Sequence, residues 1–150
     1  MKKASVLCFL LLTFTCLFVK GQQDGPVTIN PGDPAFREKF SQLSFEGKFY
    51  TLAVRDQVNN YYMADFTLLP GRFEKVYFIN LVYTSDRIVS IDSDISQDRL
   101  WFMVNNKYTD SEAAVEFDAL KEKTLATSVS LTQDEKEEWI KKNDKFKQSK

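Results

Sequence analysis

The sequence contains no histidine, and both of its cysteines, Cys8 and Cys16, lie near the N-terminus. Beyond Cys16 the chain therefore cannot supply a Ser-His-Asp triad, a Cys-His nucleophile or a zinc site of His and Cys ligands. It also lacks Ser-x-x-Lys, Tyr-x-x-x-Lys, Gly-x-Ser-x-Gly and glycine-rich phosphate-loop motifs. Asp and Glu are the side chains that remain for catalysis.

The chain also lacks an excess of charge, because 20 basic and 21 acidic residues give a net charge of −1. A domain that binds nucleic acid needs a surplus of Lys and Arg to neutralise phosphates. We therefore do not expect nucleic acid as a partner.

The first residues carry the pattern of an export signal. Two lysines precede an uncharged apolar run, Ala4–Val19, and a cut after Gly21 leaves Gln22 as the new N-terminus. We predict a signal peptide over residues 1–21 and an exported protein, either periplasmic or secreted. The apolar run is shorter than the about 20 residues that cross a bilayer, so no stable membrane span is expected after cleavage.

Cleavage at this point changes the chemistry of the chain. It removes three lysines and both cysteines, so the remaining stretch of about 129 residues has 17 basic and 21 acidic residues, a net charge of −4, and no possible disulfide. A lipoprotein signal ending at Cys16 is the alternative, but bulky Phe14 before that cysteine disfavours it. The mature domain must be held together by its core.

Residues 22–32 are polar and interrupted by Gly and Pro, which is typical of a flexible segment leading into a single domain, residues 33–150. Asp33 followed by Pro34 is the pattern of a helix N-cap with proline in the first turn. We predict a short helix there, because the next apolar residues recur at helical spacing: Phe36, Phe40 and Leu43.

The middle of the chain is rich in β-branched and aromatic residues, separated by short turn-forming clusters. Five strands are predicted, at Lys48–Arg55, Tyr61–Leu69, Phe73–Thr84, Ile88–Asp92 and Leu100–Val104. Apolar residues of the third segment also fit a helical period, but its density of β-forming residues favours a strand. Because the connections are too short for a crossover helix, we expect an antiparallel meander.

The final third of the sequence predicts two helices. Thr109 with Glu112, and Thr132 with Glu135, have the spacing of capping boxes, and the second helix is expected to reach about Lys147. The predicted fold class is therefore α+β, with an antiparallel meander sheet of about five strands, one N-terminal helix and a C-terminal helix pair.

The densest acidic loop offers a weak candidate for calcium, with Asp92, Asp94 and Asp98 as its carboxylates. An EF-hand needs Gly at the sixth position and Glu at the twelfth, where this chain has Gln97 and Met103. We favour a polar turn that joins two strands, and otherwise predict no cofactor. A hydrolase built on two carboxylates is a further alternative, although the sequence indicates no particular pair.

Apolar residues occupy both faces of the predicted strands, and one of those faces could bind a partner or ligand. The candidate residues are Tyr61, Met63, Tyr77, Ile79 and Tyr83. Tyrosines on such a face suit a protein, a second copy of the chain, or a small apolar or sugar ligand. The hypothesis loses its support if both faces of the sheet are covered.

These observations favour a non-catalytic exported domain, a binding or interaction module that contacts another exported or envelope protein, or itself, through an aromatic sheet face. A structural or assembly accessory of an envelope complex is the first alternative. A carboxylate-based hydrolase is the second.

Overall fold

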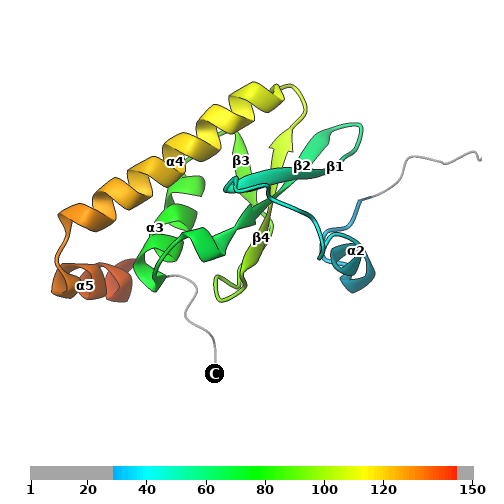
Figure 1. The fold of residues 1–150 in the computed structure, drawn as a ribbon. Coiled ribbons are helices and arrows are strands. Elements are labelled where there is room, and N and C mark those ends of the chain that lie inside the picture. Colours follow the sequence, from blue (N-terminus) through cyan, green and yellow to red (C-terminus); the bar gives the residue numbers. More distant parts are fainter. Residues whose placement is uncertain (1–28, 145–150) are drawn as a thin grey trace, which may run out of the picture.

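A computed structural model describes residues 29–144 of the chain. The predicted signal peptide and residues 145–150 lie outside this range. The described chain forms an antiparallel sheet of four strands with helices on both sides, which confirms the α+β class with one strand fewer than expected (Figure 1). No helix between residues 29 and 144 is long and apolar enough to cross a membrane.

The four strands have the spatial order β1-β2-β4-β3. Their bounds are Tyr50–Arg55 for β1, Asn59–Asp65 for β2, Ile88–Ser90 for β3 and Arg99–Asn105 for β4. Because β4 is antiparallel to both of its neighbours, β2 and β3 run parallel to each other on either side of it. The sheet is therefore a hairpin followed by a crossover and a return strand, and differs in this from the predicted meander.

The prediction of a third strand at Phe73–Thr84 is wrong, because this segment forms helix α3, Arg72–Val82. Its apolar residues satisfy a helical period as well as a strand period, and the helix buries one side against the sheet. Packing of α3 against the sheet, whose strands are distant in sequence, outweighs the β propensity of the individual residues. The helix also supplies the crossover that joins two parallel strands.

The other helices begin where their capping residues predict. Helix α2, Pro34–Lys39, starts after Asp33, whose side chain accepts a hydrogen bond from the N–H of Ala35 at 2.9 Å. Both predicted capping boxes are present and open helices α4, Asp110–Ser130, and α5, Gln133–Asn143. A short 3₁₀ turn, Phe66–Leu68, ends the second predicted strand early.

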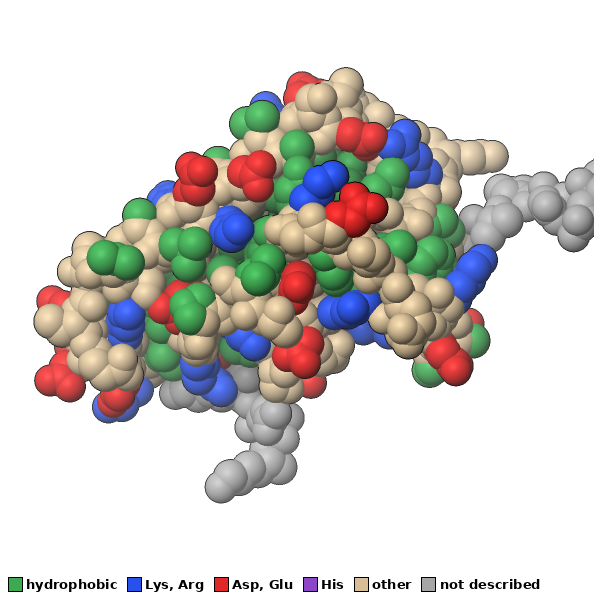
Figure 2. All heavy atoms as spheres, viewed as in Figure 1, with side chains coloured by type: hydrophobic (Ala, Val, Ile, Leu, Met, Phe, Trp, Pro, Cys, Tyr) green, Lys and Arg blue, Asp and Glu red, His purple; other side chains and the backbone are tan. Residues whose placement is uncertain are grey.

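Both faces of the sheet are covered by hydrophobic clusters. The larger cluster fills the space between the sheet and α3 and α4, and it includes Tyr62, Phe78, Phe102 and Phe117. The smaller cluster lies on the opposite face of the sheet, which α2 covers (Figure 1). In this cluster Phe36 and Phe40 pack against Trp101. On the surface, acidic and basic side chains are interspersed over the face shown in Figure 2.

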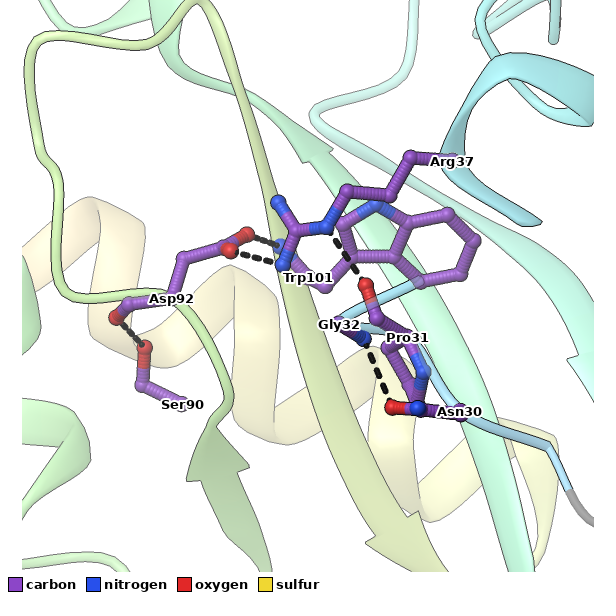
Figure 3. Close-up of polar contacts among 7 residues, drawn as sticks. All are labelled: Asn30, Pro31, Gly32, Arg37, Ser90, Asp92 and Trp101. Carbon is purple, nitrogen blue, oxygen red and sulfur yellow. Dashed lines mark hydrogen bonds and ion pairs between the residues drawn. The ribbon is translucent and has the colours of Figure 1, made fainter. Parts of the chain in front are cut away.

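Helix α2 is attached to the sheet through one buried carboxylate. Asp92, whose side chain is 4% exposed, pairs with Arg37 of α2 and accepts a hydrogen bond from the N–H of Trp101 at 2.6 Å (Figure 3). Arg37 also donates through Nε to the carbonyl of Pro31 at 2.5 Å. The last residues of the predicted flexible segment, 29–32, therefore contact the domain.

Candidate functional site

The five residues of the predicted aromatic face do not share one surface. Tyr61 and Met63, 5% and 2% exposed, are buried in the smaller cluster beneath α2. The other three lie on or at the end of helix α3, where Ile79 is fully buried, Tyr77 packs on Trp139, and Tyr83 is 56% exposed. The predicted face is absent from the described chain because its third strand is a helix.

The three carboxylates of the predicted calcium loop do not converge on one site. Asp92 anchors α2, whereas Asp94 accepts hydrogen bonds from the N–H and hydroxyl of Ser96, which lower the pKa of the Asp94 carboxyl. Asp98 is exposed. Among residues 29–144 no group of three acidic side chains is placed to hold a metal ion.

A pocket of about 380 Å³ opens where the β1–β2 turn meets the start of helix α4. We call it the polar pocket, and it is lined by Arg55, Asp56, Asn60, Asn106, Tyr108, Thr109 and Asp110. Two segments that are far apart in the sequence build it: the β1–β2 hairpin, and the β4–α4 connection together with the first residue of α4. Its volume falls within the roughly 300–1,000 Å³ that is usual for small-molecule sites.

One wall of the polar pocket is organised around Asp110, the first residue of α4. Its carboxylate accepts a hydrogen bond from the Tyr62 hydroxyl at 2.7 Å and pairs with Arg55 of β1. Burial of Tyr62, followed by its hydrogen bond to Asp110, raises the pKa of its hydroxyl well above the usual value. This side chain therefore stays neutral and acts as a fixed donor.

The part of the polar pocket formed by the β1–β2 turn is organised around Asp56. Its carboxylate accepts from the N–H groups of Val58 and Asn59, both at 2.7 Å, and from the Tyr61 hydroxyl at 2.8 Å. Partial burial by itself would raise the pKa of Asp56, but these three hydrogen bonds outweigh burial and lower it. Asp56 is consequently ionised at neutral pH, and its turn is held in one conformation.

The two asparagines of the polar pocket differ in their bonding. Asn106 ties the β4–α4 connection to the hairpin, since its Nδ2 donates to the carbonyl of Gln57 at 2.6 Å and its N–H to that of Val58 at 2.8 Å. Asn60 is 5% exposed, and its side chain makes no hydrogen bond with any residue between 29 and 144.

A second pocket, of about 360 Å³, lies at the start of α3 and is lined in part by Arg72, Lys75 and Asp98. Arg72 already pairs with Asp144, the residue that follows α5, at 2.5 Å. None of the polar residues that line this second pocket is buried. We therefore take the polar pocket as the candidate functional site.

No protein-family model, curated protein or solved structure matches this chain. The polar pocket was not predicted from the sequence, because its residues follow no motif and come from positions 55–60 and 106–110. The Thr109–Glu112 capping box located the start of α4, and with it one edge of the pocket. The approach of the hairpin to that edge had no signal in the sequence.

Proposed function

We propose that this protein is an exported, non-catalytic domain that binds a small polar ligand in the polar pocket. The observation that carries the proposal is a pocket lined by polar side chains that are held in place by hydrogen bonds and an ion pair, together with the accessible amide of Asn60, which bonds to no other group among residues 29–144. A largely pre-formed cavity with a few convergent polar groups is the usual form of a ligand site. The apolar run Ala4–Val19 supports export.

The bonding of the two carboxylates favours binding over hydrolysis. A glycosidase needs one carboxyl whose pKa is raised, so that it carries a proton at neutral pH. Asp56 has a lowered pKa, and the Asp110 carboxylate is occupied by Tyr62 and Arg55. Both side chains serve in this proposal as fixed acceptors.

The ligand site can be tested by titrating ¹⁵N-labelled protein with small polar compounds of neutral, anionic and cationic type. We expect at least one class to shift the backbone amides of Asn60, Asn106 and Asp110 in a saturable way. Gly71 and Ser96, at the second pocket, serve as internal controls. Shifts confined to those two residues would place binding at the second pocket and contradict the proposal.

Export can be tested by the mass of the protein recovered from the envelope or medium of the cells that produce it. A chain that begins at Gln22 has lost both cysteines and is inert to thiol reagents. A chain that begins at a lipid-modified Cys16 would establish the lipoprotein alternative. A full-length chain retained in the cytoplasm would contradict export.

A further inference from the structure

Resting on the proposed function, we propose that the ligand of the polar pocket is a neutral, polyhydroxylated molecule such as a monosaccharide, and that the Asn60 side-chain amide orients it. Three features of the pocket favour such a ligand: the amide of Asn60, which bonds to no other described residue, the balance of charge, and the donors and acceptors that the fixed side chains still offer.

Asn60 occupies a position where an apolar residue would be expected. It lies on β2 opposite Val104 of β4, and shares the face of Tyr62 and Ala64, both in the larger core cluster. A buried amide without a hydrogen bond costs about 1–3 kcal/mol. Because the Asn60 amide is accessible, solvent bonds to it in the free protein, and a ligand that excludes solvent from the pocket must bond to the amide in turn to avoid this cost.

The amide of Asn60 opens onto the polar pocket. Every fully enclosed side-chain nitrogen or oxygen among the described residues has a hydrogen-bond partner. The amide atoms of Asn60 have none, so they are not fully enclosed, although the residue as a whole is 95% buried (5% exposed). The pocket that Asn60 lines is therefore where they are accessible.

The charges in the pocket favour a neutral ligand. Among the lining residues, Arg55 and Asp110 form an ion pair and largely neutralise each other, which leaves the ionised Asp56. Two cations, Arg87 and Lys107, lie against the ring of Tyr108 and offset the charge of Asp56. A phosphate or carboxylate ligand would be repelled by Asp56 and would compete with Asp110 for Arg55. A cation would gain from Asp56 but would leave the donor groups of Arg55 and Asn60 without an acceptor.

Hydroxyl groups match the remaining donors and acceptors, because each can donate one hydrogen bond and accept others. The Asn60 amide offers both a donor and an acceptor, and Asp56 offers acceptor lone pairs. The N–H groups of Asp110 and Ser111, in the first turn of α4, have no intrahelical acceptor. Several hydroxyls on one small molecule could satisfy these groups together.

In this proposal Tyr108 contacts the ligand through its hydroxyl rather than through the face of its ring. Arg87 and Lys107 lie 5.2 Å and 4.8 Å from the centroid of its ring, so the ring is already in contact with cations. Within residues 29–144 its hydroxyl has no hydrogen-bond partner. This adds one more uncharged group that can donate to or accept from a hydroxyl.

The test is an NMR titration of the ¹⁵N-labelled protein with neutral monosaccharides, inorganic phosphate and lysine as separate probes. We expect a neutral sugar to shift the side-chain NH₂ resonances of Asn60 in a saturable way at millimolar concentration. Asn60→Leu, which keeps the number and branching of the side-chain heavy atoms, should weaken the binding of that sugar at least tenfold. Asn80→Leu is the matched control, since Asn80 bonds to the carbonyl of Val76 on α3, away from the pocket.

The outcomes distinguish failure of the proposed ligand class from failure of the proposed function. Phosphate or lysine binding at the pocket, with no sugar bound, would overturn the ligand class and leave the proposed function standing. Sugar binding unchanged by Asn60→Leu would overturn the role of Asn60. If no probe shifts the pocket resonances, both proposals fail. The Asn60 resonances of the unmodified protein decide the matter even if Asn60→Leu does not fold.

Discussion

Buried carboxylates in this domain are each matched by specific donors. Glu74 on α3 accepts a hydrogen bond from the Ser128 hydroxyl and lies 3.7 Å from the ammonium of Lys136. Asp92 is held by Arg37 and by the N–H of Trp101. Charges are rarely buried unless they are paired and hydrogen-bonded, so these contacts explain both residues structurally without a ligand.

Replacement of Asp92 should therefore reduce stability rather than abolish metal binding. Asp92→Ala leaves the buried N–H of Trp101 and the Arg37 guanidinium without their partner, and should cost about 2–4 kcal/mol in the free energy of unfolding. Chemical denaturation measures this cost. Asp98→Ala, in the same acidic loop but exposed, should change stability by less than about 0.5 kcal/mol. Equal effects of the two substitutions would contradict the assignment.

At the scale of elements, α4 and α5 are fixed at their N-termini by reciprocal capping. In α5 the Thr132 hydroxyl accepts from the N–H of Glu135 at 3.4 Å, while the Glu135 carboxylate accepts from the N–H of Thr132 at 2.8 Å. The helix is joined to α3 by two ion pairs, Lys136–Glu74 and Arg72–Asp144. Loss of the cap should therefore lower the free energy of unfolding of the whole domain.

Thr132→Ala removes the capping hydroxyl and should lower the free energy of unfolding by about 1 kcal/mol. Thr132→Ser keeps the hydroxyl and should lose no more than a few tenths of that value. Equilibrium unfolding of the two variants and the unmodified protein gives the comparison. A loss of the same size in Thr132→Ser would point to the methyl group rather than the cap.

For the whole molecule, the shifted pKa values predict a stability that falls at both ends of the pH range. Hydrogen bonds lower the pKa of Glu112, Glu135 and Asp94, and their stabilisation is present above the usual values of 4.5 and 3.8 and lost as pH falls below them. Burial raises the pKa of Tyr61 and Tyr62 above 10.0. Their contribution is complete below pH 10 and is lost as pH rises through the raised values.

Urea denaturation at a series of pH values should show a plateau near neutrality and a decline on the alkaline side that begins at about pH 10. Tyr62→Phe should make the alkaline decline shallower, because the most strongly shifted hydroxyl is gone. Tyr83→Phe is the control, since Tyr83 is 56% exposed. An alkaline slope unchanged by Tyr62→Phe would contradict this account.

Helix boundaries and chemical exclusions could be predicted from the sequence because they depend on neighbouring residues. Asp33 with Pro34, and the capping boxes at Thr109 and Thr132, act over one turn of backbone, and each helix starts where they indicate. The absence of histidine, and of cysteine after Cys16, excludes several chemistries in any fold. These conclusions need no tertiary contacts.

Two features were decided only by tertiary structure. Residues 72–82 have apolar positions that suit a helix or a strand, and packing against the sheet selects the helix. This choice removes the predicted aromatic face and creates the crossover. The polar pocket depends on pairing of β2 with β4, which brings Asn60 near the start of α4. The sequence alone determined the local caps and the missing chemistry, because those are short-range properties, whereas the arrangement of distant polar residues follows from burial of apolar surface in the folded chain.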